Sequence, residues 1–184
     1  LEVTANTTLD SKRGISLTAA STIIVDSGDT LTYNGILAST STYALTKAGA
    51  GTLILGGANT YTGATTVNTG TLVLAHNNGL GTTAAGTTVA SGATLDLNNV
   101  TVGAEALTLA GGTLTDTTSS LSGNIILTAD SNLGATNVGD TLTLSGVISG
   151  NYAITKVGAG TVVLTGTNTY TGATNINAGK LSLS

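Results

Sequence analysis

Histidine is a natural starting point in a search for catalytic chemistry, and this sequence contains a single one, His76, in the segment AHNNG. A serine-type hydrolase needs a nucleophile, a base and an orienting carboxylate within reach of one another. The sequence has no Gly-x-Ser-x-Gly motif to supply such a nucleophile. We therefore interpret His76 as a surface residue of a turn and expect no catalytic residue of this kind.

Paired carboxylates are the second possibility, because polysaccharide-cleaving enzymes use two acids that flank the scissile bond. Asp96, Glu105 and Asp116 lie near one another in the sequence and are therefore candidates for such a pair. Alignment on Thr94 and Thr113 places Asp96 opposite residue 115, a threonine, so the two aspartates do not stack directly. We interpret these acids as solvated turn residues that keep the protein soluble, and expect no enzyme.

Two further acid pairs, Asp26 with Asp29 and Asp130 with Asp140, lie in turns rich in small and polar residues. Carboxylate oxygens bind Ca²⁺, but the ion takes six to eight oxygen ligands and each pair supplies only two carboxylates. The Gly-Gly-x-Gly-x-Asp pattern of calcium-binding repeats is also absent. We expect no metal site and no cofactor.

Tyrosine and threonine offer binding rather than catalysis. Tyr61 and Tyr170 could stack on a carbohydrate, but we expect each ring to cover one end of an apolar core and to keep its hydroxyl in water. Thr-x-Thr triplets resemble those with which ice-binding proteins order water, and they occur at residues 30–32, 60–62, 113–115, 141–143 and 169–171. The triplets fall at different points of the repeat described below, so we expect no continuous flat array.

The composition indicates the elements that must carry these side chains. Apolar residues make up 40% of the 184 residues and charged residues only 8%, a combination that argues against disorder. The apolar residues are mainly Leu, Ile, Val and Ala interleaved with Thr, a composition typical of half-buried strands. A net charge of -4 with five basic residues offers no patch for nucleic acid, and no apolar run is long enough to insert in a membrane.

The sequence repeats itself at two scales. Residues 43–74 and 152–183 agree at 21 of 32 positions, 109 residues apart. Within and between these copies a threonine followed by an aliphatic residue recurs every 19 to 28 residues. The threonines are Thr30, Thr52, Thr71, Thr94, Thr113, Thr141 and Thr161, with Lys180 in the same place at the end. Their aliphatic followers are Leu31, Leu53, Leu72, Leu95, Leu114, Leu142, Val162 and Leu181.

A spacing of about 20 residues matches one coil of a β-solenoid, since helical repeats are longer and hairpins shorter. We therefore predict an all-β fold: a right-handed parallel β-helix of about nine coils, with the aliphatic followers stacked in one column. Strand alternation should direct Leu53 and Leu55 inward and the residues between them outward. Glycines such as Gly49, Gly51, Gly56, Gly57, Gly63 and Gly70 should form corners with positive φ.

The repeated phrase, Lys-x-Gly-x-Gly-x-aliphatic-x-Leu followed by Asn-Thr-Tyr-Thr-Gly, resembles the autotransporter-associated β-strand repeat of Gram-negative passenger domains. The resemblance is strong in the two copies and weak in residues 75–137, where we expect more irregular coils. The structural positions of the repeat are Gly49, Gly51, Leu53, Leu55, Asn59, Tyr61, Gly63, Gly70, Leu72, Leu74, Gly158, Gly160, Val162, Leu164, Asn168, Tyr170, Gly172, Gly179 and Leu181.

The resemblance implies a secreted, surface-exposed rod without a common catalytic activity. We interpret residues 1–184 as a single β-helix segment, a fragment of a larger passenger, that acts as a non-catalytic stalk supporting adhesion and export-coupled folding. Its expected partners are the rest of its own passenger, a translocator barrel in the outer membrane and, through its open ends, other copies of itself. The main alternative is an adhesin module that binds a glycan or the host matrix, with ice binding and polysaccharide cleavage considered after it.

Overall fold

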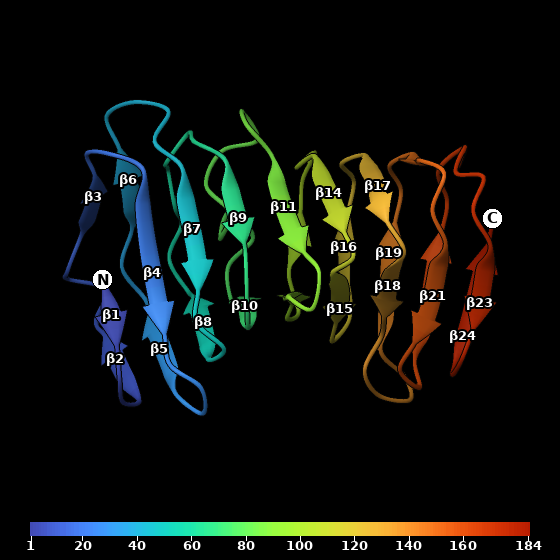
Figure 1. Ribbon diagram of the computed structural model, residues 1–184, viewed down its shortest axis with the longest axis horizontal. Coiled ribbons are helices and arrows are strands. Elements are labelled where there is room, and N and C mark those ends of the chain that lie inside the picture. Colours follow the sequence, from blue (N-terminus) through green and yellow to red (C-terminus); the bar gives the residue numbers. More distant parts are fainter.

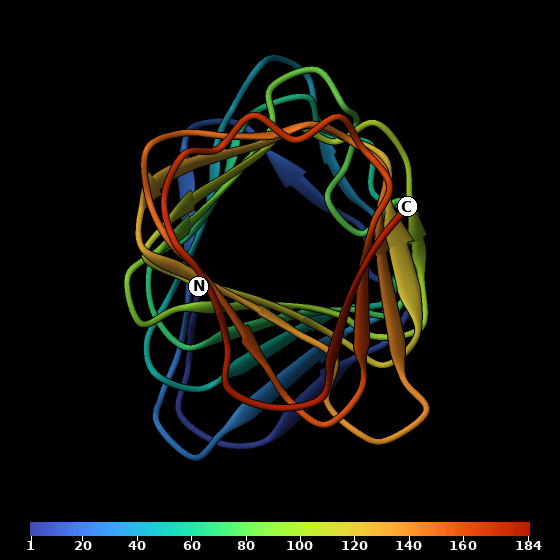
Figure 2. The ribbon, with the colours of Figure 1, turned by 90° about the vertical axis from the view of Figure 1, so that its right-hand side faces the viewer.

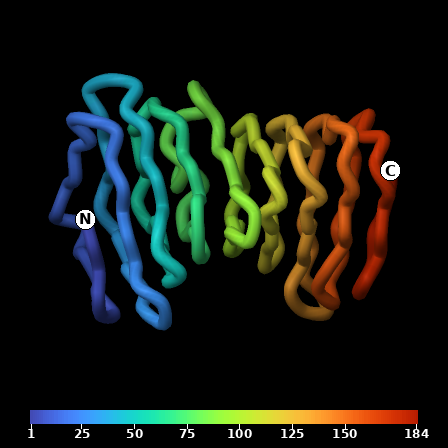
Figure 3. Tube along the Cα trace, viewed as in Figure 1, coloured from blue at the N-terminus to red at the C-terminus, as the bar shows by residue number.

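The computed structural model describes all 184 residues, Leu1–Ser184, as a solenoid of about nine coils with roughly 20 residues in each. The chain winds continuously from one end to the other, so that the two termini lie at opposite ends (Figures 1 and 3). Seen along the axis, each coil has three sides around a common interior (Figure 2). The structure contains no helix, and hence none that is long and apolar enough to cross a membrane.

Three long parallel sheets and one short sheet form these sides. The first sheet consists of β1 (Glu2–Val3), β4 (Ser21–Val25), β7 (Leu45–Ala48), β9 (Thr65–Val67), β11 (Thr87–Ala90), β14 (Leu107–Ala110), β17 (Ile125–Ala129) and β20 (Ile148–Ser149). The second consists of β2 (Thr7–Leu9), β5 (Thr30–Tyr33), β8 (Thr52–Leu55), β10 (Thr71–Leu74), β12 (Thr94–Leu97), β15 (Thr113–Asp116), β18 (Ser131–Gly134), β21 (Ile154–Val157) and β23 (Thr174–Ile176). The third consists of β13 (Thr101–Val102), β16 (Ser119–Leu121), β19 (Thr141–Leu144), β22 (Thr161–Leu164) and β24 (Lys180–Leu183), and the short sheet of β3 (Ile15–Leu17) and β6 (Leu37–Ser39).

Strand alternation builds the core as the sequence predicts. In β8 the side chains of Leu53 and Leu55 are buried while Thr52 and Ile54 are half-exposed. In the pairing of β8 with β10, Leu72 lies opposite Leu53. Each inward aliphatic side chain contributes about 1.5 to 3 kcal/mol by leaving water, and stacking places these side chains in one continuous core along the rod.

The predicted single column of aliphatic residues is wrong beyond Leu114. Leu133, and not Leu142, lies opposite Leu114 in the second sheet. Leu142 belongs to the third sheet, where Val162 lies opposite it. The reason is the interval of 28 residues between Thr113 and Thr141, because it carries the chain once around the coil and then on to the next side.

The same offset separates the two repeat copies. Lys47 lies in β7 of the first sheet, whereas its counterpart Lys156 lies in β21 of the second. Likewise, β8 of the first copy belongs to the second sheet and β22 of the second copy to the third. The copies are therefore rotated by one side of the coil relative to each other.

Residues 75–137, which we expected to be less regular, continue the first and second sheets through β11 to β18 and begin the third at β13. One irregularity occurs in the pairing of β14 with β17, where the register shifts between Leu109 and Ala110. A second is the loop of residues 75–86 between β10 and β11, which contains no strand.

Candidate functional site

A buried lysine is the most unusual feature of the repeat coil. Lys47 alternates in phase with Leu45, points inward between Ile23 and Val67 of the adjacent coils, and is 0% exposed. Its Nζ donates to the carbonyl oxygens of Ala48 at 2.8 Å, Gly49 at 2.7 Å and Thr69 at 3.2 Å. An ammonium group has three donors, so all three are used, one of them on the following coil.

The second copy reproduces this arrangement. Lys156 is also 0% exposed, and its Nζ donates to Val157 O at 2.7 Å, Gly158 O at 2.8 Å and Ala178 O at 3.2 Å. Burial lowers the pKa of Lys47 to about 8 and lowers the pKa of Lys156 as well. At pH 7 Lys47 therefore remains mostly charged. The carbonyl oxygens supply the polar environment that a buried charge requires.

Asn59 joins three coils. Its Oδ1 accepts from Leu37 N at 2.8 Å in the preceding coil, and its Nδ2 donates to Gly79 O at 2.7 Å in the following one. In the second copy, Asn168 Oδ1 accepts from Ile148 N at 2.8 Å. The two side chains thus accept the same kind of bond at equivalent positions of the two repeats.

Tyr61 does not cover the end of the core with its hydroxyl in water, as we expected. The side chain is 0% exposed, and its hydroxyl lies 2.7 Å from Thr65 Oγ1 inside the rod. Burial raises the pKa of Tyr61 above its ordinary value. The expectation failed because Thr65 also points inward and provides a partner.

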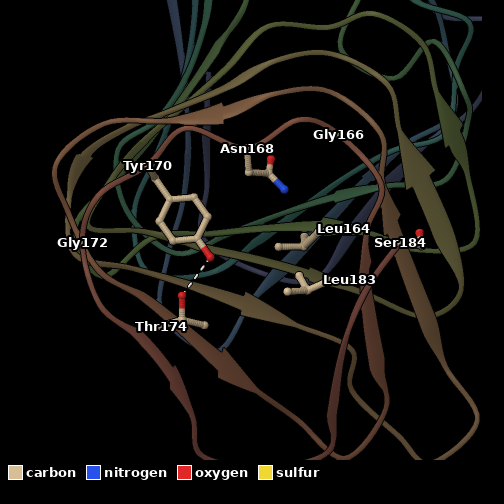
Figure 4. A pocket seen from close by; sticks show the side chains of 8 residues that line it. All are labelled: Leu164, Gly166, Asn168, Tyr170, Gly172, Thr174, Leu183 and Ser184. Atoms are coloured by element: carbon tan, nitrogen blue, oxygen red, sulfur yellow. Dashed lines mark hydrogen bonds between the residues drawn. The ribbon is translucent and has the colours of Figure 1, made fainter.

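Tyr170 forms the matching bond to Thr174, 2.8 Å between the hydroxyl oxygens, in the last coil (Figure 4). Leu164, Asn168 and Leu183 line the same cavity of about 680 Å³, which opens at the C-terminal end of the rod. Leu183 is 71% exposed there. The tyrosine–threonine bond is therefore present in both repeat copies.

The glycines serve two purposes, and positive φ is only one of them. Gly49 and Gly70 have φ of 76° and 69°, as predicted for corners. Gly57 and Gly63 do not have positive φ; instead, a Cβ at Gly57 would lie 1.9 Å from Gly35 O, and one at Gly63 would lie 2.0 Å from Tyr43 O. At these positions, glycine is required because the backbone of the preceding coil passes too close for a side chain.

The acids of residues 96–116 are not solvated turn residues. Asp116 is 0% exposed and points inward, with Oδ2 accepting from the backbone N–H groups of Thr118 and Ser119 at 2.8 Å each. Burial raises the pKa of Asp116 despite these bonds, and burial followed by the charge of Asp116 raises the pKa of Asp96. The register places Asp96 opposite Thr115, as predicted, so the two aspartates do not stack.

Asp116 also fixes an unusual backbone conformation. Thr118 has φ of 81°, which is rare for a β-branched residue. The carboxylate holds the N–H of Thr118, and the Ser119 hydroxyl donates to Leu97 O in the preceding coil. Asp116 is therefore a structural acid of a corner, with an Oδ1 that has no hydrogen-bond partner.

Glu105 is also buried, with only 3% of its surface exposed. Its Oε1 accepts from the Thr87 hydroxyl at 2.8 Å, and burial raises its pKa although this bond opposes the shift. The sequence suggested a solvated acid at this position; the inward direction of Thr87 explains the difference.

The other sequence candidates lie apart from one another. His76 is in a turn, where its Nδ1 accepts from Asn78 N at 3.0 Å. Asp130 and Asp140 are engaged with different backbone N–H groups, those of Ala153 and Asn137. Nowhere do three acid, histidine or cysteine side chains lie together as potential metal ligands.

Threonines stack in a way that the triplets did not reveal. On the outer face of the first sheet, one threonine per coil lies in register over five consecutive coils: Thr22, Thr46, Thr66, Thr88 and Thr108. Ile126 follows Thr108 and ends the series. The expectation of no continuous array across the triplets therefore overlooked a shorter series made from single threonines.

Sequence reasoning missed the lysines and the buried acids, although a signal was present. Lys47 is two residues after Leu45, and Asp116 two residues after Leu114, so strict alternation places both side chains inside. The general tendency of charged residues to be exposed outweighed this signal.

Comparison with known proteins agrees with the geometry of the coil. The family model described as Passenger-associated-transport-repeat matches residues 45–74 and 154–183, the two coils with the buried lysines. No solved structure gives a significant match.

The chain is also 41% identical over 159 residues to the "Adhesin BmaC autotransporter" of Brucella suis biovar 1 (strain 1330). The match covers 84% of this chain and 4% of that protein, so the chain corresponds to a small part of its length. The resemblance to autotransporter repeats is thus confirmed, and residues 45–74 and 154–183 are two passenger-associated-transport repeats in a parallel β-solenoid.

Proposed function

We propose that the chain is a rigid, non-catalytic segment of a surface-exposed autotransporter passenger, which holds an adhesive region away from the bacterial cell. The relative bears the name of an adhesin. The observation that carries the proposal is the bonding between coils: Lys47 and Lys156 each donate to a carbonyl of the following coil. A rod held together through its interior resists bending without any further domain.

The same bonds favour folding in step with export. A single coil cannot bury its aliphatic residues, and each new coil is stabilised by its neighbour. Thr69 O and Ala178 O come 22 residues after the lysines that donate to them. A chain that emerges from a translocator barrel would therefore complete each lysine site as the next coil arrives.

The test is surface display of this segment between an N-terminal epitope tag and a translocator barrel in a Gram-negative host. Leu72→Asp introduces an unpaired carboxylate into the core, where Leu72 is 0% exposed. Thr66→Asp introduces the same side chain at a half-exposed outward position and is the matched control. We expect the tag to be displayed and the rod to resist protease in the control but not in Leu72→Asp; equal display and resistance in both would contradict the proposal.

A second function, binding of a host ligand, is favoured by one observation only. A polar cleft interrupts the third side of the rod beside Glu105.

A further inference from the structure

The backbone hydrogen bonding between two adjacent coils is interrupted beside Glu105. Thr82 N donates to Tyr61 O of the preceding coil at 3.0 Å, and Ser122 N donates to Val102 O at 3.3 Å, so the coils before and after are joined. No backbone hydrogen bond connects residues 78–83 with residues 103–105. The two adjacent coils are therefore separated here, where the loop of residues 75–86 faces the segment that follows β13.

The resulting cleft has a volume of about 370 Å³, and hydrogen bonds between the two coils bound it at each end. At one end Thr101 N donates to Asn77 Oδ1 at 2.9 Å. At the other, Thr87 donates to Ala106 O through its N–H and to Glu105 Oε1 through its hydroxyl, both at 2.8 Å. An extended peptide cannot run through such a slot as an added strand, so the cleft suits a compact ligand.

The lining is rich in hydrogen-bonding groups that the protein leaves free. The side chains of Asn78, Thr82 and Thr83 line the cleft and make no hydrogen bond within the protein. Glu105, buried at its floor, receives a protein donor at Oε1 only. Amide, hydroxyl and carboxylate groups together can both donate to and accept from a ligand that carries several hydroxyl groups.

Charge and size restrict the ligand further. Glu105 is the one ionisable residue that lines the cleft, so an anionic ligand would meet a negative charge without a compensating base. A Ca²⁺ ion needs six to eight oxygen ligands, and this cleft offers only one carboxylate to such a site. The volume is at the lower end of the range of small-molecule sites.

We propose that this cleft binds a neutral saccharide unit of a surface glycan, with its hydroxyl groups hydrogen-bonded to Glu105 and Asn78. The assignment rests on the second function proposed above, binding of a host ligand, and names the ligand class for it. Leu80 and Val102 line the same cleft and supply an apolar surface for the faces of the sugar ring.

Amide NMR spectra of the purified 184-residue chain test the proposal, with galactose, glucose, mannose, fucose, N-acetylglucosamine and N-acetylgalactosamine as neutral probes. N-acetylneuraminic acid serves as the anionic probe. We expect at least one neutral sugar to shift the amide signals of residues 78–83 and 103–106 in the millimolar range, and the acidic sugar to shift none of them.

Glu105→Gln keeps an acceptor for the Thr87 hydroxyl and removes the charge, so the fold should be retained while binding weakens by roughly tenfold. Asn78→Ala should weaken binding by a few-fold, and the remote exposed Asn175→Ala is the matched control with unchanged binding. Thermal melts of each variant show that the fold is intact.

The proposal is overturned if no neutral sugar shifts these signals, if the shifts are spread over the whole rod, or if Glu105→Gln and Asn78→Ala leave them unchanged. Failure here is distinguishable from failure of the stalk proposal, because that proposal is measured by surface display and protease resistance. Both cleft substitutions should leave those two measurements unaffected.

Discussion

Substitution of Lys47 by Met is the sharpest test of the buried-lysine site. Met has a similar length and no donor, so Gly49 O and Thr69 O lose the hydrogen bonds that the structure gives them. A buried carbonyl without a donor costs about 1 to 3 kcal/mol. Removal of a desolvated charge offsets part of this loss, and we expect a net destabilisation of about 1 to 3 kcal/mol at pH 7.

The pH dependence of the free energy of unfolding separates the cost of the desolvated charge from the contribution of its hydrogen bonds. The folded pKa of Lys47 is about 8, below the ordinary value of 10.5, so the unfolded chain holds more protons between these values. Stability from this group therefore rises with pH from about 8 to 10.5 and is lowest below pH 8. Lys47→Met lacks this rise, whereas the tyrosine titrations are common to both proteins and cancel in the difference.

Guanidinium unfolding followed by circular dichroism, repeated at several pH values between 7 and 10.5, measures this difference. The wild-type advantage over Lys47→Met should grow as the pH increases. An advantage that shrinks across this range would mean that the three carbonyls hold the ammonium more tightly than water does, and would refute the role of burial. Lys156→Met, with the same bonds but a terminal neighbouring coil, should show a smaller loss.

Three further predictions concern buried polar groups and close backbone contacts. Asp116→Asn should raise the melting temperature by a few degrees at pH 7, because it keeps an acceptor for the N–H groups of Thr118 and Ser119 and removes a buried charge. Asp116→Ala should lower the melting temperature. Since burial raises the pKa of Asp116, the gain of Asp116→Asn over wild type should vanish as the pH falls towards 4. Tyr61→Phe should cost about 1 to 2 kcal/mol by leaving the Thr65 hydroxyl without a partner. Tyr170→Phe, in the exposed last coil, should cost less than about 0.5 kcal/mol in the same denaturant melt. Equal losses would contradict the difference in burial between the two tyrosines. Gly57→Ala should destabilise the rod by more than about 1 kcal/mol, because its Cβ would meet Gly35 O. Gly92 has a positive φ but open space around it, so Gly92→Ala should cost about 1 kcal/mol from backbone strain alone. Thermal melts that rank the two variants in the opposite order would refute the close-contact argument.

The regular part of this fold follows from period and alternation. The pairing of Leu53 with Leu72 and of Asp96 with Thr115 is predictable because the coils between them have nearly constant length. Alternation then decides which side chains are buried. These two features define the ladder of the solenoid without any long-range information.

The less regular part depends on contacts that sequence spacing does not contain. Gly57 and Gly70 look alike in the sequence, but Gly57 is needed for a close contact between coils alone, whereas Gly70 combines such a contact with a positive φ. The acceptors of Lys47 lie in a turn and in the next coil, so its burial becomes favourable only when both are in place. The cleft beside Glu105 likewise forms where backbone hydrogen bonds between two coils are missing, and no sequence motif predicts this.

The rotation between the two repeats constrains the binding function proposed above. Lys47 packs between Ile23 and Val67, whereas Lys156 packs between Leu133 and Ile176, on a different side of the coil. The bonds of the two lysines nevertheless fall at the same sequence offsets, so each repeat carries its own stabilising contacts wherever it lies on the rod. Equivalent outer surfaces of the two copies consequently face different directions. In the proposed binding function, a receptor that bound one copy could not reach the equivalent surface of the other by a shift along the axis.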